Sequence, residues 1–280
     1  MSLIQTILMG IIQGLTEFLP VSSSGHLVLI SSLCKVFSDS DFLISGQQEV
    51  FLDIILHVGS LIAVLIYFKN DLIKIIREFF KAVKTKDFSS PEAKLPGFLV
   101  LGTFFTVMVA FPLKDTCEKL VESPAIVGCF IFLTGVILFI SDVVSSKIDK
   151  TNKIGIRQAI LIGVAQGFAA FPGISRSGST ISTGLLLGLD RVASARYSFL
   201  LSILIIMATS VFYPMLEFTP SEILAFDLKA IFVGFVVSAI VSYFCIKYFL
   251  QFLNKHSMRV FAYYCLAMGT FMAVFFHFFV

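Results

Sequence analysis

The chain alternates long apolar runs with shorter polar stretches. Six of the runs approach the length of about 20 apolar residues that a helix needs to cross a bilayer. These runs lie at 50–68, 97–112, 124–140, 198–214, 230–250 and 260–280. Within them, polar and apolar residues do not alternate as they do in the strands of an outer-membrane barrel. The pattern therefore predicts an all-α, polytopic integral membrane protein.

The composition supports a membrane protein and argues against two other classes. Of the 280 residues, 57% are hydrophobic and 14% are charged, and the mean hydropathy is +0.95. A soluble domain of this size carries more charge on its surface. The net charge of +3 is modest, and the sequence has no concentrated basic face of the kind that binds nucleic acid.

The distribution of charge predicts how the chain lies in the membrane. Sixteen of the 21 Lys and Arg residues fall in four stretches, at 69–94, 142–157, 191–196 and 247–259. The loops at 35–49, 114–122 and 217–229 are rich in Asp and Glu instead. Because basic loops stay in the cytoplasm, we expect the four stretches inside and the three acidic loops outside. The run 71–86 is expected to form an amphipathic helix that lies at anionic headgroups.

The stretch 156–189 lies between two of the basic stretches, so it begins and ends on the cytoplasmic side. Its middle is too polar for two ordinary spans. We therefore expect a re-entrant helix–loop–helix that dips into the membrane and returns, with Arg176 near its tip.

The same stretch contains one copy of an internal repeat. Residues 10–25 read GIIQGLTEFLPVSSSG and residues 163–178 read GVAQGFAAFPGISRSG, with seven identities in sixteen positions at a constant offset of 153. Each copy precedes three spans, which predicts a single membrane domain of two repeats, 1–145 and 146–280. Loop charge puts the first copy's entry on the outside. The repeats are therefore expected to be inverted, with interrupted helices that meet near the bilayer midplane.

The first copy concentrates acid–base chemistry. Gln13 and Glu17 are four residues apart and share one helical face, and Pro20 ends that half-helix. Ser22, Ser23 and Ser24 can cap the next half-helix.

The start of that next half-helix suits an anion. Gly25 lets the backbone approach a ligand, and the free N–H groups at a helix N-terminus attract negative charge. His26 lies in the first turn, where an imidazole can act as acid, base or nucleophile.

The second copy has different chemistry in the same frame. Ala170 occupies the place of Glu17, and Arg176 occupies the place of Ser23. Arginine at the membrane centre costs about 2.5–3.5 kcal/mol on insertion scales, so it needs a partner, and its planar fork suits phosphate oxygens. Ser175, Ser177 and Gly178 start a second helix N-terminus beside it.

Together these residues suggest phosphoryl transfer. The two helix N-termini, Arg176 and the serine hydroxyls would form an anion site, with the glycines and Gln13 around the substrate. Glu17 and His26 would form an acid–base or metal-binding pair. Glu17, with or without Gln13, could hold a divalent cation, because hard cations prefer oxygen ligands. The residues leave open whether a serine, His26 or water attacks phosphorus.

Two further polar residues allow both a functional and a structural interpretation. His57 could face the site or be a core histidine, and Asp53, one turn earlier on the same face, is a candidate partner for it. Gln166, like Gln13, either lines the site or ties one half-helix to a neighbouring backbone.

The motifs QGLTEFLPVSSSGHL (13–27) and PGISRSGSTI (172–181) resemble the two signatures of the undecaprenyl-diphosphate phosphatase family, the integral membrane enzymes known for bacitracin resistance. The segment FLDIILHVGSLIAVLIYF at 51–68 resembles that family's third conserved stretch. The resemblance covers essentially the whole chain.

This resemblance implies hydrolysis of undecaprenyl diphosphate to the monophosphate and inorganic phosphate in the bacterial inner membrane, which recycles the lipid carrier for peptidoglycan synthesis. It also implies Mg²⁺ or Ca²⁺ as a cofactor, Glu17 and His26 as catalytic residues, Ser23 as nucleophile or phosphate ligand, and Ser175 and Arg176 as diphosphate ligands. Some members of the family have Glu where this chain has Gln13, and Gln is a weaker metal ligand that exchanges no proton.

A second hypothesis is a lipid-phosphate flippase or anion transporter, because inverted repeats with broken helices are typical of transporters. The convergence of Glu17, His26 and Arg176 with serines favours the enzyme, since a carrier has no need of an acid–base pair. The expected partners are the lipid substrate and membrane lipids. The oligomeric state is left open, a homodimer included.

Overall fold

The computed structural model describes residues 3–37 and 46–279. Over these residues the secondary structure is helical and contains no strand, which confirms the all-α prediction. The elements are α1 (Leu3–Thr16), α2 (Ser23–Phe37), α3 (Gly46–Tyr67), α4 (Lys69–Thr85), α5 (Pro91–Ala110), the 3₁₀ turn η2 (Phe111–Leu113), α6 (Lys114–Val121), α7 (Pro124–Ser145), α8 (Ile156–Phe168), α9 (Arg176–Leu186), α10 (Arg191–Glu217), α11 (Pro220–Ala225), α12 (Leu228–Leu253) and α13 (Arg259–Phe278).

Six of these helices are long and apolar enough to cross a membrane, namely α3, α5, α7, α10, α12 and α13. They correspond one to one with the six apolar runs, so the polytopic prediction is confirmed. Several of the helices extend past the apolar run into polar residues, as α10 does at Arg191, because a helix continues through the headgroup region without a break in its hydrogen bonding. The predicted outer loop 35–49 falls partly on residues 38–45, outside the described part of the chain.

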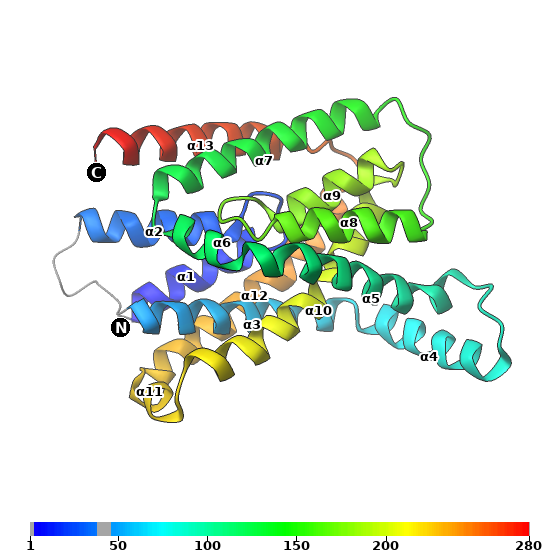
Figure 1. The fold of residues 1–280 in the computed structure, drawn as a ribbon, viewed down its shortest axis with the longest axis horizontal. Helices are drawn as coiled ribbons and strands as arrows, with labels where there is room; N and C mark the ends of the chain where they lie inside the picture. Colours follow the sequence, from blue (N-terminus) through cyan, green and yellow to red (C-terminus); the bar gives the residue numbers. More distant parts are fainter. Residues whose placement is uncertain (1–2, 38–45, 280) are drawn as a thin grey trace.

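Four shorter helices form two hairpins. Helices α1, α2, α8 and α9 contain 14, 15, 13 and 11 residues, fewer than the roughly 20 that a span requires. Figure 1 shows the α1–α2 hairpin and the α8–α9 hairpin extending toward each other from opposite ends of the molecule, with their turns meeting in the middle. Three spanning helices follow each hairpin. The inverted repeat stays a prediction, and this arrangement supports it.

Small residues let each hairpin pack closely against the other half of the chain. Helix α1 packs on α12, and helix α8 packs on α5. A Cβ at Gly14 would lie 2.9 Å from the Ser238 carbonyl oxygen, and one at Gly167 would lie 2.9 Å from that of Thr106. Glycines at matching repeat positions therefore allow the same close helix packing, since a side chain there would force the helices apart.

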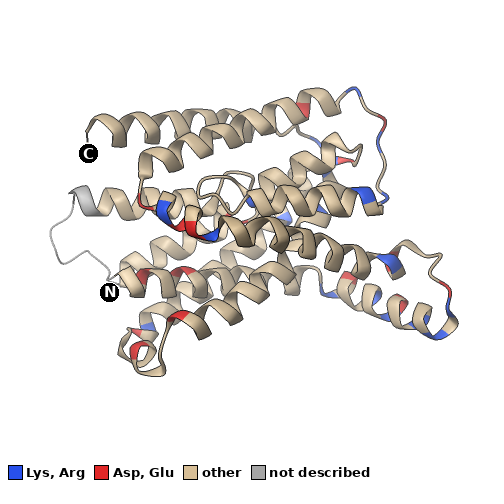
Figure 2. Cartoon of the chain, in the orientation of Figure 1, with Lys and Arg blue, Asp and Glu red and all other residues tan. Residues whose placement is uncertain are grey.

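One end of the molecule carries most of the basic residues. Figure 2 shows Lys and Arg gathered where α4 meets α5 and in the α7–α8 loop, at the end that loop charge assigns to the cytoplasm. The predicted amphipathic helix is present as α4. Asp142 of α7 is 1% exposed and pairs with Arg191 at 2.9 Å and with Arg259 at 3.0 Å. This buried carboxylate ties α7, α10 and α13 together at the basic end.

Candidate active site

The first turn places a carboxylate directly after α1. The backbone N–H of Glu17 donates to the Gln13 carbonyl oxygen at 2.9 Å, so the helical path continues one residue past the end of α1. Ser22 then adopts φ 70°, and its Oγ accepts the N–H of Gly25 at 3.3 Å. Ser22 is thus the cap of α2, and Ser23 is the first residue of that helix.

The second turn is capped in the same way. Ser175 precedes α9 and accepts the N–H of Gly178 at 3.0 Å, at the position that the repeat aligns with Ser22. Ser22 and Ser175, both predicted to bind substrate, therefore direct their hydroxyls to helix N-termini. Gly25, predicted to admit a ligand, instead permits packing, because a Cβ there would lie 2.6 Å from the Ile131 side chain of α7.

The two turns contact each other through an ion pair. Arg176 Nη2 lies 2.5 Å from Glu17 Oε1, with the Glu17 side chain 4% exposed. A second contact joins a side chain to a backbone, where Ser177 Oγ donates to the Leu19 carbonyl oxygen at 2.8 Å. The guanidinium from one hairpin and the carboxylate from the other therefore form one site, as the sequence predicts.

The other oxygen of the carboxylate accepts hydrogen bonds from two side chains of the first hairpin. Glu17 Oε2 accepts Ser23 Oγ at 2.7 Å and Gln13 Nε2 at 2.9 Å. The predicted shared face of Gln13 and Glu17 is confirmed by this contact. A serine hydroxyl that donates to a carboxylate is arranged as nucleophile and base are in covalent catalysis.

A histidine from a spanning helix completes the surroundings of Glu17. His57 Nε2 of α3 lies 3.4 Å from Glu17 Oε2. Its Nδ1 lies 2.8 Å from the Asp53 carbonyl oxygen and 3.4 Å from Asp53 Oδ1. His57 therefore faces Glu17, as one of its two interpretations predicts, and Asp53 is in contact with the other ring nitrogen. The functional role of His57 stays a prediction.

The other histidine is held away from this cluster by two hydrogen bonds. His26 Nδ1 lies 2.7 Å from the Ser22 carbonyl oxygen, and His26 Nε2 lies 2.6 Å from the hydroxyl of Tyr264 on α13. A carbonyl oxygen only accepts, so Nδ1 carries the proton and Nε2 accepts from Tyr264. Tyr264 was not predicted, because no spacing in the sequence connects it to His26.

Three predicted residues lie outside the central contacts. Ser24 is exposed, with its Oγ 3.4 Å from Ser22 Oγ. Gln166 Nε2 donates to Thr106 Oγ1 at 2.9 Å, which is the structural interpretation of Gln166, a tie between α8 and α5. Gly178 packs against the Ser175 side chain that caps its N–H.

Two buried polar atoms beside Glu17 have no hydrogen-bond partner among the described residues, Gln13 Oε1 and Arg176 Nη1. An unpaired buried polar group is costly, so both atoms suit a ligand. The arginine nitrogen fits a phosphate oxygen, and the amide oxygen fits a hard cation. Within the described residues, no group of three His, Cys, Asp or Glu side chains could hold a metal ion, so a cation here would also need oxygens from the substrate.

The fold and the site define a polytopic membrane protein whose two hairpins present an arginine beside a serine–carboxylate pair. The chain belongs to the family described as "Bacitracin resistance protein BacA", which matches residues 6–271.

The chain is similar along its length to proteins named undecaprenyl-diphosphatase. One from Rubrobacter xylanophilus is 35% identical over 98% of each chain. Others from Halothermothrix orenii and Methanobrevibacter smithii are 38% and 37% identical, each over 96% of both chains.

Proposed function

We propose that this protein is an undecaprenyl-diphosphate phosphatase of the bacterial inner membrane, which hydrolyses the C55 prenyl diphosphate to the monophosphate and so recycles the lipid carrier for cell-wall synthesis. The names of the relatives support this activity. The observation that carries the proposal is the contact of Arg176 with Glu17 at 2.5 Å, because it puts a phosphate-binding charge and a base into one buried site. The relatives described above are not named as transporters, and the flippase alternative has no support from them.

Substrate binding is assigned to the second hairpin. Arg176 Nη1 is buried without a hydrogen-bond partner in the described part of the chain and would donate to an oxygen of the terminal phosphate. The adjacent N-terminus of α9 adds a favourable dipole for an anion. In the transition state the same donors would stabilise the charge that develops on the equatorial oxygens.

The first hairpin is assigned the chemistry. Ser23 Oγ attacks the terminal phosphorus and gives its proton to Glu17 Oε2, while the bond to the bridging oxygen breaks and undecaprenyl monophosphate leaves. Water then attacks the phosphoserine, the phosphorus–Oγ bond breaks, and Ser23 takes back the proton from Glu17. Both protons of the water leave with inorganic phosphate. His57 holds Glu17 in place between these steps.

We also propose that a divalent cation, Mg²⁺ or Ca²⁺, takes part. Glu17 and the free Gln13 Oε1 are the residues that would hold it, with further ligands from the diphosphate. When bound, the ion neutralises charge on the phosphate oxygens. With an amide in place of a second carboxylate, the protein's own contribution to cation affinity is expected to be weak.

The test is phosphate release from a C55 prenyl diphosphate by the protein purified in detergent, with Mg²⁺, with Ca²⁺ and with a chelator. We expect release with at least one cation, and a failure to release phosphate under all conditions would contradict the function. The nucleophile has its own test, in which substrate labelled at the terminal phosphate should leave acid-stable label on Ser23. Ser23→Ala should lose both label and turnover while Ser24→Ala keeps both. Turnover without label would contradict the serine step alone.

A further inference from the structure

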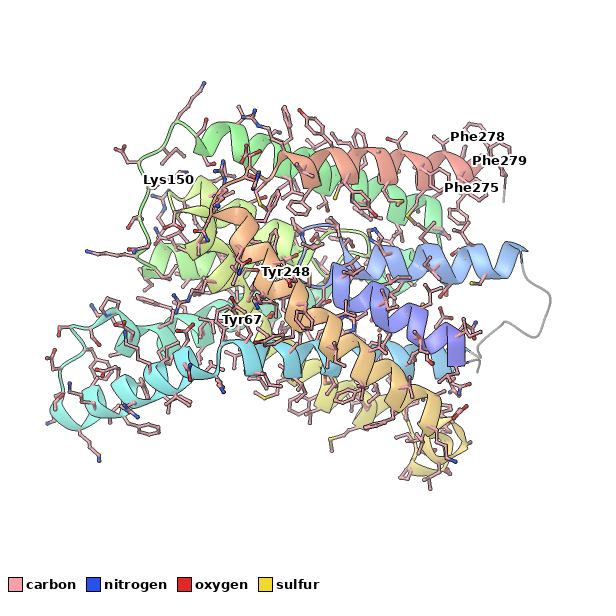
Figure 3. The ribbon with its side chains drawn as sticks, turned by 180° about the vertical axis from the view of Figure 1, so that it is seen from behind. Tyr67, Lys150, Tyr248, Phe275, Phe278 and Phe279 are labelled. Atoms are coloured by element: carbon pink, nitrogen blue, oxygen red, sulfur yellow. The ribbon has the colours of Figure 1, made fainter. Side chains whose placement is uncertain are left out.

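The basic end of the molecule contains a cavity that the phosphatase site does not use. Its volume is about 980 Å³, and it lies between the α4–α5 hairpin, the loop that follows α7, and the start of α10. Figure 3 labels Lys150 in that loop, at the same end of the molecule as the α4–α5 hairpin. The two turns of the active site lie in the middle of the molecule instead.

The lining of the cavity combines apolar and charged side chains. The apolar ones include Leu95, Phe98, Leu185 and Leu200. The charged ones are five Lys or Arg residues and three Asp or Glu residues: Lys74, Lys150, Lys153, Arg191 and Arg196, and Asp71, Glu92 and Asp190. A cavity with apolar side chains and an excess of positive charge fits an anionic amphiphile better than a free ion.

Three of the five cations already have carboxylate partners. Arg196 pairs with Asp71 at 2.7 Å, and Lys74 pairs with Glu92 at 2.6 Å. Arg191 pairs with Asp142 from outside the cavity.

Asp190, the third acid in the wall, is occupied as a helix cap. Its Oδ1 accepts the N–H of Ala193 at 2.7 Å. Two of the three carboxylates in the lining are therefore paired with cations, and the third caps a helix.

Positive charge remains in the loop. Lys150 and Lys153 make no hydrogen bond or ion pair through their side chains to any residue that the structure describes. Burial and the nearby Arg191 guanidinium lower the pKa of Lys150 below its ordinary value, while Asp142 and Asp190 act in the opposite direction. Arg191 Nε is also buried without a hydrogen-bond partner in the described part of the chain.

We propose that this cavity binds the phosphate headgroup of an anionic membrane lipid, with Lys150, Lys153 and Arg191 on the phosphate and an acyl chain along the apolar side chains of the lining. The site is separate from the phosphatase site and does not depend on it. Its position at the basic end, beside the amphipathic helix α4, would place it at the headgroups of the inner leaflet.

The experiment measures binding of dioleoyl phosphatidic acid to the purified full-length protein in phosphatidylcholine nanodiscs. Lys150→Gln/Lys153→Gln should weaken binding about 10- to 30-fold. The attraction of each basic residue to an anionic headgroup is worth roughly a fivefold change in affinity, and the variant removes two of them. The matched control is Lys84→Gln/Lys86→Gln, which removes the same charge from exposed positions outside the cavity. Equal losses in both variants would mean that overall charge, not this cavity, attracts the lipid.

Two further measurements show whether a lipid or free phosphate binds, and where the lipid binds. Millimolar inorganic phosphate should compete poorly with the lipid, and full competition would contradict an amphiphile site. A photoreactive phosphatidic acid should label residues of the 146–154 loop or the start of α10. Labelling confined to residues 17–26 would assign the binding to the phosphatase site and overturn the proposal.

Discussion

The α1–α2 and α8–α9 hairpins have the same construction and opposite chemistry. Both have a serine cap at the matching position, Ser22 and Ser175, and both pack through glycines on a spanning helix of the other half. Yet the first hairpin carries the carboxylate and the hydroxyl that donates to it, and the second carries the guanidinium. The shared features fix how each turn is built and packed, and the differences between the copies supply the charged pair.

The largest effect is expected at the carboxylate, because Glu17 is proposed to be the base of the first hairpin. We expect Glu17→Gln to lower kcat/KM about 1000-fold or more, because the amide cannot accept the Ser23 proton. Phosphate release measures the effect, and Glu118→Gln on the exposed helix α6 is the control for loss of a carboxylate. If Glu17→Gln kept a tenth of the activity, Glu17 would not be the base.

The second prediction concerns His57, which is proposed to hold Glu17 in place. His57 lies 3.4 Å from Glu17, so His57→Gln should lower kcat by about 100-fold, because a displacement of about 1 Å in a catalytic group can cost that much rate. His256→Gln, at an exposed position after α12, is the control. An unchanged kcat in His57→Gln would return His57 to a purely structural role.

The third prediction concerns the hydrogen bond from Tyr264 to His26. Tyr264→Phe removes one neutral hydrogen bond, which is worth about 1 kcal/mol and corresponds to roughly a fivefold change in rate. If the tyrosine orients His26 for turnover, Tyr264→Phe should change both the value of kcat and the dependence of kcat on pH. Tyr263→Phe, the neighbouring exposed tyrosine, should leave both unchanged, and an identical result for the two variants would show that the contact does not matter for turnover.

The smallest effects on activity are expected where the hairpins are alike. Gly14→Ala and Gly167→Ala should each destabilise the protein by about 1–3 kcal/mol through overpacking, seen as similar decreases in the thermal midpoint in detergent. Gly97→Ala, which has open space around it, should change little. A large decrease in the thermal midpoint for one glycine variant and none for the other would contradict the structural equivalence of the hairpins.

The sequence predicts the parts of the molecule that depend on local pattern. Apolar run length locates the six spans, and the four-residue spacing of Gln13 and Glu17 predicts their contact. The sequence does not distinguish a capping serine from one that contacts Glu17. Ser22, Ser23 and Ser24 differ only in the hydrogen bond that each hydroxyl makes after the turn forms. Nor does it predict Tyr264, since the approach of α13 to His26 follows from packing across the whole chain.

The central claim is that the two turns act as one site, and a double-mutant cycle between them tests it most directly. Glu17→Gln, Arg176→Lys and the double variant are compared by kcat/KM for C55 prenyl diphosphate, with thermal midpoints to confirm folding. Residues that act as a unit are strongly non-additive, so the double variant should be little worse than Glu17→Gln alone. Losses that multiply, as for independent sites, would contradict the account.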